Sequence, residues 1–137
     1  ELEQKFKVKE LTIYESEHWI WSLRPHQATL AAGILSLKRE CTSFGELEKK
    51  EFEDLYNIIS VIETTLKKVV NYDVINYMML MMFDKQVHYH IFPRFENTTF
   101  LGEAWKDENW PAVPTLLGDP LDDEKLKEIA LYIKSNI

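Results

Sequence analysis

The 137-residue chain is predicted to fold as one α+β domain spanning residues 1–137, with an antiparallel sheet of about five strands, one long helix and a C-terminal helix. Two observations predict this class. Short strand-like segments are grouped on either side of a single long stretch of helical periodicity. No repeat, low-complexity tract or linker rich in proline and glycine divides the sequence.

Three strand segments are expected before the long helix. Lys5–Tyr14 alternates loosely between apolar and polar residues and predicts a strand or a hairpin arm. His18–Leu23 predicts a second strand, in which Trp19 and Trp21 share one face. Ala31–Lys38 predicts a third strand. Together they form the first part of the sheet.

The long helix is predicted between Glu48 and Val70, where apolar residues recur at steps of three and four. Charged and amide residues occupy most of the intervening positions, so the helix should lie on the sheet along one apolar face. That face is expected to consist of Phe52, Leu55, Tyr56, Ile59, Ile62, Leu66, Val69 and Val70.

A strand pair should follow the helix. Ile75–Phe83 predicts a buried strand, Asp84-Lys85 a two-residue turn, and Gln86–Phe92 the antiparallel partner. The methionines of this first strand suit an adaptable core or a dimer seam.

The rest of the chain is expected to be irregular up to Pro120 and helical after it. Segment 96–137 is thus predicted to contain an irregular tail over Asn97–Pro120 and a final helix after it. Asp122 can cap this helix. Its buried face should consist of Leu126, Ile129, Ala130 and Ile133.

The charge and the cysteine content restrict the function. The formal net charge is −7 and no element carries a cluster of Lys and Arg, which argues against nucleic acid as a partner. Cys41 is the one cysteine, so no disulfide can form within the chain and a reducing compartment is expected. No apolar run is long enough for a signal peptide or a membrane span, so we expect a cytoplasmic protein without membrane contact.

Two histidines lie two residues apart in QVHYHIFPR, residues 86–94. On a strand, Gln86, His88 and His90 share one face and the apolar residues between them share the other. The apolar set should meet the helices, which leaves a polar set facing solvent, a cleft or another subunit. A coordinated break in the apolar pattern of this kind is typical of functional sites.

Three interpretations of the two imidazoles remain open from these residues. They could fill a half-exposed face of the sheet without a chemical role. They could be two ligands of a zinc or iron ion, although the sequence offers no obvious third ligand. They could also carry nucleophilic or acid–base chemistry, because an imidazole with a pKa of about 6.5 is mostly neutral at pH 7.

QVHYHIFPR resembles the active-site strand of the histidine triad (HIT) superfamily, in which His-φ-His-φ-His-φ-φ is often followed by Pro-Arg. Asn76, ten residues before Gln86, matches an Asn that the family keeps on the preceding strand. The segment LRPHQATLAAGILSLKRECTSFGEL is similar to the family's strand, loop and helix region. The likeness covers most of Leu11–Phe95, with the motif region at 72–95, and implies a HIT-like sheet.

The resemblance implies a hydrolase or nucleotidyl transferase that acts on nucleoside phosphoramidates or dinucleoside polyphosphates. His88 would attack the α-phosphorus and form a nucleotidyl-histidine intermediate, which water then hydrolyses. His90 would hold His88 in the attacking tautomer, and Gln86 would polarise the phosphate or the leaving group. Asn76 and Arg94 would contact the nucleotide. No metal or cofactor is required, and the expected partners are a purine nucleotide or nucleotide conjugate and a second copy in a homodimer.

The sequence departs from the family pattern at two places. Gln86 stands at the first triad position, and the Gly-Gln-Ser/Thr segment that binds the α-phosphate is replaced by MMFDK. The alternatives to an enzyme are a catalytically weak nucleotide-binding module and a metal-binding β protein. Arg94 could equally form an ion pair, while Trp105 and Trp110 could stack on a base or hold the tail on the body. The enzymatic interpretation requires His88 to project into an open pocket.

Overall fold

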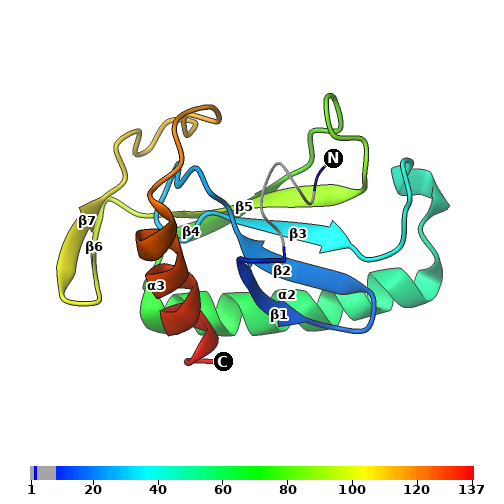
Figure 1. Cartoon of the computed structure of the whole chain (residues 1–137), viewed down its shortest axis with the longest axis horizontal. Coiled ribbons are helices and arrows are strands. Elements are labelled where there is room, and N and C mark those ends of the chain that lie inside the picture. Colours follow the sequence, from blue (N-terminus) through cyan, green and yellow to red (C-terminus); the bar gives the residue numbers. More distant parts are fainter. Residues whose placement is uncertain (1, 3–8) are drawn as a thin grey trace.

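The structure is a computed structural model that describes residue 2 and residues 9–137. It is an α+β fold built on a five-stranded antiparallel sheet of order β1-β2-β3-β5-β4 (Figure 1). The strands are β1 (Thr12–Glu15), β2 (Trp19–Leu23), β3 (Gly33–Leu37), β4 (Val74–Met78) and β5 (His88–Arg94). The predicted fold class is therefore confirmed. The first predicted strand begins only at Thr12, because residues 9–11 form a turn, and its residues 5–8 lie outside the described part of the chain.

One face of the sheet forms the core against helix α2 (Lys49–Val69). The cross-strand row Trp21, Leu35 and Tyr89 lies on this face. Trp19 shares the face and donates its indole N–H to the Glu51 carbonyl of α2 at 2.8 Å. Because side chains alternate along a strand, the histidines of β5 point to the opposite face.

Helix α2 is where it was predicted, but part of its predicted apolar face is wrong. Phe52 and Tyr56 are 42% and 77% exposed, whereas Ile58 is fully buried. Leu55, Ile62, Leu66 and Val69 pack into the core as expected. Neighbouring positions on a helix differ by about 100° in direction. The sheet therefore buries a narrower set of positions than the apolar periodicity of the sequence predicted.

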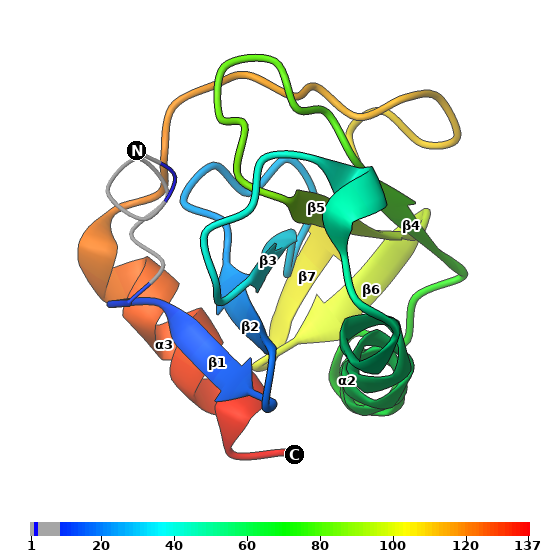
Figure 2. The same cartoon turned by 90° about the vertical axis from the view of Figure 1, so that its right-hand side faces the viewer.

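The C-terminal helix α3 (Asp123–Lys134) also agrees with the prediction. The Asp122 carboxylate accepts hydrogen bonds from two backbone N–H groups of the first turn, as an N-cap does. The four predicted core residues of α3 are buried, and the helix packs beside β1. Figure 2 shows α2 and α3 on the lower side of the sheet, with the loops that follow β4 and β7 above it.

The segment after β5 contains a hairpin that was predicted to be irregular. Strands β6 (Asn97–Phe100) and β7 (Glu103–Lys106) pair through a turn in which Leu101 and Gly102 both have positive φ, 51° and 74°. Such a turn favours glycine at its second position. Phe100 fastens the hairpin to α3 by an edge contact with Tyr132, with ring centroids 5.1 Å apart.

The predicted strand Ile75–Phe83 is wrong in its second half. β4 ends at Met78, and Asp84-Lys85 is part of a loop over residues 79–87 rather than a two-residue turn. Met82 and Phe83 are 75% and 92% exposed, so they are not buried core. The loop bends over the face that carries the histidines, which an ideal hairpin could not do.

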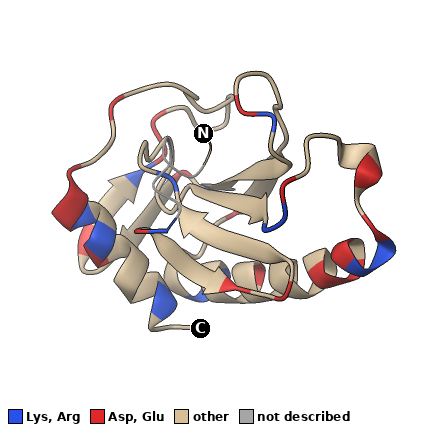
Figure 3. Ribbon diagram, turned by 45° about the vertical axis from the view of Figure 1, so that its right-hand side comes forward, with Lys and Arg blue, Asp and Glu red and all other residues tan. Residues whose placement is uncertain are grey.

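Charged residues are concentrated on the helices and loops. Figure 3 shows acidic and basic residues following one another along α2, while most of the strand ribbon is uncharged. In the part of the chain that the structure describes, no helix combines the length and apolar composition needed to cross a membrane.

Candidate active site

The pairing of β3 with β5 brings polar side chains together on the face of the sheet that points away from α2. Ser36 is the cross-strand partner of His88, and Ile34 is the partner of His90. The rings of His88 and His90 lie edge to face with their centroids 5.0 Å apart. Side chains directly opposite on neighbouring strands lie about 5 Å apart at Cβ, so Ser36 joins the two histidines in one polar cluster.

His88 is held in one orientation by the backbone. Its Nδ1 lies 2.5 Å from the Gln86 carbonyl oxygen, and the side chain is buried, at 1% exposure. A carbonyl oxygen only accepts hydrogen bonds, so Nδ1 must carry the proton. In the neutral ring this leaves Nε2 with its lone pair, which is the tautomer that a nucleophile needs.

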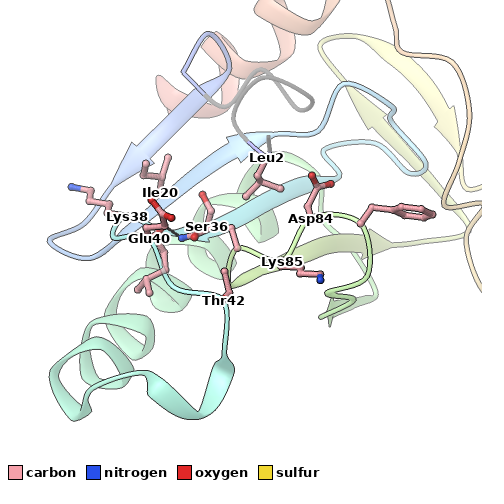
Figure 4. Close-up of a pocket in the computed structure, with 11 residues that line it drawn as sticks. Leu2, Ile20, Ser36, Lys38, Glu40, Thr42, Asp84 and Lys85 are labelled. Atoms are coloured by element: carbon pink, nitrogen blue, oxygen red, sulfur yellow. Dashed lines mark hydrogen bonds between the residues drawn. The ribbon is translucent and has the colours of Figure 1, made fainter.

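A polar cavity of about 710 Å³ is lined by Ser36, the cross-strand partner of His88 (Figure 4). Its floor is formed by Ile20 and Ser36 from the sheet, and Gln86 lies at its edge next to the histidines. Charged groups of both signs line the rest of this cavity: Lys38, Glu40, Asp84 and Lys85. The buried side chain of Leu2 also lies against it.

A second cavity, of about 400 Å³, is mostly apolar. His90 lines it together with Arg24 and His26, which follow β2. The loop after β4 and the segment before α3 supply its apolar walls, with Leu80, Met82, Phe83, Leu116 and Leu117.

His88 itself lines neither cavity, so the expectation of an open pocket at this ring is wrong. Its neighbours two positions away on the strand, Gln86 and His90, each line one of them. The ring therefore lies between the two cavities and is covered. Neither histidine is half exposed either, since His90 is only 8% exposed.

Gln86 does not have the free amide that was expected. Its Nε2 donates to the Leu37 and Arg39 carbonyls at 2.9 and 2.7 Å. Its Oε1 accepts the Cys41 backbone N–H at 3.0 Å. Both amide hydrogens are thus engaged, and the side chain joins the start of β5 to the segment after β3 instead of reaching toward a phosphate.

Arg94 is committed to an ion pair rather than to a ligand. Its Nε donates to Asp107 Oδ2 at 2.6 Å, and both side chains are buried, at 6% and 0% exposure. Nη2 also donates to the Ala112 carbonyl at 2.6 Å. Of the two roles that the sequence allowed, the structure supports the ion pair, and it does so in the interior rather than at the surface.

The remaining predicted residues lie away from the histidines. Asn76 is exposed on β4 opposite Phe92, and it lines neither cavity. Trp105 is half-buried against the core, with its indole nitrogen inside, and therefore holds the β6–β7 hairpin on the body. Trp110 is half-buried and lines neither cavity.

Three residues near the two histidines were not predicted from the sequence: Ser36, Arg24 and His26. Ser36 lies in a segment that resembles an apolar strand, and only the β3–β5 register brings it opposite His88. Arg24 and His26 belong to an Arg-Pro-His sequence directly after β2. These basic residues at the end of a strand were the signal in the sequence that could have pointed to the cavity. The cavity also needs the segment at Leu116, about ninety residues later, whose carbonyl accepts a hydrogen bond from Arg24.

The described residues contain no group of three or more His, Cys, Asp and Glu side chains arranged to hold a metal ion. The predicted pair of ligands, His88 and His90, thus gains no third ligand from this part of the chain. The metal-binding interpretation has no geometric support here.

No family model matches the sequence, and no curated protein matches it either. Solved structures do match over nearly the whole chain. A histidine triad protein from Sinorhizobium meliloti has a TM-score of 0.73 at 22% identity, covering 93% of this chain and 89% of its own.

Two further structures show the same arrangement. A histidine triad protein from Bradyrhizobium japonicum has a TM-score of 0.71 at 19% identity, covering 96% of this chain and 94% of its own. The diadenosine triphosphate hydrolase of Plasmodium falciparum has a TM-score of 0.62 at 13% identity, covering 93% and 76%. These matches show that this chain has the fold of histidine triad proteins.

Proposed function

We propose that the protein is a nucleotide hydrolase or nucleotidyl transferase that cleaves nucleoside phosphoramidates or dinucleoside polyphosphates at the α-phosphate. The hydrogen bond from His88 Nδ1 to the Gln86 carbonyl carries this proposal, because it fixes the tautomer that can attack phosphorus. The fold supports it as well, since one structure of this fold is a diadenosine triphosphate hydrolase. The nucleotide would be a purine nucleotide or a conjugate of one.

The proposed reaction proceeds in two displacements. In the first, a bond forms between His88 Nε2 and the α-phosphorus while the bond from phosphorus to the leaving group breaks. In the second, water attacks the phosphorus, the N–P bond breaks, and the nucleoside monophosphate leaves with the imidazole restored. His90, whose ring meets the edge of His88, helps to keep that ring in place. No metal or cofactor takes part in either step.

A nucleophile between two cavities suits a substrate with a reactive phosphorus between two larger groups. One group would occupy the polar cavity beside Gln86 and the other the apolar cavity beside His90. Because the His88 ring is 1% exposed, the side chains that cover it must move when the substrate binds. Neither Gln86 nor Arg94 is assigned to the phosphate, because their donors are engaged within the protein.

A second candidate is a nucleotide-binding module with little turnover. Two observations favour it: the nucleophile is covered, and Gln86 offers neither a free amide hydrogen nor an acidic proton to the leaving group. Such a module would bind a nucleoside monophosphate in the polar cavity without forming the covalent intermediate.

The experiment compares the wild type with His88→Ala during incubation with an adenosine phosphoramidate and with a diadenosine polyphosphate. AMP release should resist chelators and be lost in His88→Ala, and denaturing mass spectrometry should detect one added AMP on the wild type. His18→Ala is the matched control, because His18 is partly exposed beside Glu17 and outside both cavities. AMP binding without release would support the module instead, and equal release by His88→Ala would overturn the proposed mechanism.

The proposed assembly is a homodimer in the cytoplasm. β4 is an edge strand of the sheet, and its Val74 side chain is 50% exposed. Such an edge can pair with a second copy. The buried, reduced Cys41 is compatible with a reducing compartment.

A further inference from the structure

The register of the sheet places the Ser36 hydroxyl directly against the proposed nucleophile. The Leu37 N–H donates to the Val87 carbonyl at 3.1 Å, so the next pair along the two strands, Ser36 and His88, is a non-hydrogen-bonded pair. In antiparallel sheets the Cα atoms of such a pair are about 4.5 Å apart, and the side chains are closer than in hydrogen-bonded pairs. Ser36 is therefore the nearest neighbour of His88 on β3.

The Ser36 hydroxyl faces the polar cavity without a partner in the described part of the chain. Ser36 is 4% exposed and lines this cavity, and the apolar Ile20 lies opposite it on β2 (Figure 4). None of the described residues hydrogen-bonds to its Oγ, and His88 makes its hydrogen bond through Nδ1, on the other side of the ring from the attacking Nε2. A buried hydroxyl that faces a cavity without a partner indicates a group that enters the cavity to accept its hydrogen bond.

The donors on either side of this pair are already engaged. Gln86, two residues before His88, gives both amide hydrogens to backbone carbonyls. Lys38, two residues after Ser36, forms an ion pair with Glu15 at 3.2 Å. Of these three neighbouring donors, the Ser36 hydroxyl is the one that a substrate can use.

We infer that the Ser36 hydroxyl donates a hydrogen bond to one non-bridging oxygen of the α-phosphate while His88 Nε2 attacks the phosphorus. The inference rests on the proposed function, because it takes the phosphate to lie between Ser36 Oγ and the His88 ring. A donor that is in place before the reaction stabilises the charge on this oxygen without reorganisation. Because the hydroxyl contacts the phosphate from one side, it distinguishes the two non-bridging oxygens.

Ser36→Ala tests this hydrogen bond through AMP release from an adenosine phosphoramidate. The kcat/KM of the variant should fall about 100-fold, as expected for the loss of one donor at a reacting phosphate. The melting temperature should not fall, because the hydroxyl stabilises no other described group. Unchanged kcat/KM would overturn the inference, and so would a loss of release that is matched by a fall in melting temperature.

Ser22→Ala is the matched control for the lost hydroxyl. Ser22 is another buried serine on the same face of the sheet, where it lies opposite Ile34. Its Oγ also has no hydrogen-bond partner, but Ser22 lines neither cavity. This variant should release AMP at the rate of the wild type.

A stereochemical measurement separates the hydrogen bond from a change in structure. Replacing one non-bridging oxygen of the phosphoramidate by sulfur gives two diastereomers. Wild type and Ser22→Ala should cleave one of them about tenfold more slowly than the other, because sulfur is a weak hydrogen-bond acceptor. Ser36→Ala should cleave the two at nearly equal rates. Equal rates in the wild type, or an unchanged ratio in Ser36→Ala, would overturn the inference.

AMP binding, measured by isothermal titration calorimetry, separates this inference from the proposed reaction. If the wild type binds AMP but cleaves neither proposed substrate, the reaction is overturned and the AMP affinity decides the role of Ser36. Ser36→Ala should then bind AMP about tenfold more weakly than wild type and Ser22→Ala, because a hydrogen bond to a charged phosphate is lost. Equal affinity of all three proteins would overturn the hydrogen bond, and a wild type that neither binds nor releases AMP would overturn both proposals.

Discussion

Gln86 lies in line with His88 and His90, but its side chain binds the protein backbone instead of facing a ligand. Its amide makes three hydrogen bonds to the backbone, one at Leu37, the last residue of β3, and two at Arg39 and Cys41 just after it. A histidine at this position could not supply two donors and one acceptor in the same geometry. The amide therefore stabilises the pairing of β3 with β5, and its loss should affect stability before it affects chemistry.

Gln86→His, which places a third histidine beside His88 and His90 on the same strand face, is expected to lower the free energy of unfolding by about 2 kcal/mol, because it leaves backbone groups unpaired. Urea denaturation followed by circular dichroism measures the change. Gln27→His, at another partly buried glutamine that bonds to backbone groups, serves as a comparison for the chemical change itself. A Gln86→His variant as stable as the wild type would show that the three bonds contribute little.

The pair of Arg94 and Asp107 should behave as a buried structural ion pair. Arg94→Met leaves the Asp107 carboxylate buried without its partner, which is expected to cost about 3–5 kcal/mol. The double variant Arg94→Met/Asp107→Leu should recover part of this loss, since no charge remains buried. Thermal unfolding of both variants measures the difference. If Arg94 instead served a ligand, Arg94→Met would keep its stability and lose only nucleotide affinity.

At the scale of elements, the N-terminus of α2 depends on one buried carboxylate. Glu51 accepts the Glu48 backbone N–H at 2.8 Å and pairs with Arg39, whose Nε lies 2.6 Å from Oε2. The hydrogen bond from Arg39 lowers the pKa of Glu51 to about 2. This single residue both caps the helix and ties it to the segment after β3.

The stability contributed by Glu51 should depend on pH with a defined sign. Its pKa is 4.5 in the unfolded chain and about 2 in the folded protein, so the contribution is present above pH 4.5 and is lost as the pH falls toward 2. Because Arg39 is 44% exposed, solvent screening limits the effect to about 1–2 kcal/mol. Urea midpoints at several pH values should fall less steeply for Glu51→Gln than for the wild type. Equal slopes would contradict this role.

The loop after β4 is the part of the sheet region where the predicted strand was wrong. The apolar run Tyr77–Phe83 has the composition of a buried strand, yet only its first two residues pair with β5. Composition reports a preference for burial but does not say whether a neighbouring strand is present to pair with. The helices were easier to predict, because the period of apolar residues and the Asp122 cap are local signals.

At the scale of the whole molecule, β4 leaves one edge of the sheet unpaired within the described chain. The Leu37 N–H donates to the Val87 carbonyl, so the odd-numbered residues of β5 turn their main-chain groups toward β3, and Ile75, which lies opposite Pro93, directs its N–H away from β5. A second copy that pairs along this edge would use that group.

Ile75→Pro is therefore expected to convert the proposed dimer to a monomer, because proline removes a donor that β5 does not use. Light scattering after gel filtration measures the molar mass. Ile75→Ala is the control for the lost side chain and should stay dimeric. A wild type that is already monomeric, or an Ile75→Pro dimer, would argue against pairing along β4.

Periodicity and local hydrogen bonding were enough to predict the fold class, the long helix, the capped C-terminal helix and the placement of both β5 histidines on one face, because neighbouring residues decide these features. The roles of Gln86 in binding the backbone and of Arg94 in a buried ion pair became known from the structure alone. The same holds for the covered His88 ring, for Ser36 opposite it, and for Arg24 and His26, which line the cavity beside His90. Those outcomes depend on strand register and on contacts between segments far apart in the chain, about which local patterns carry no information.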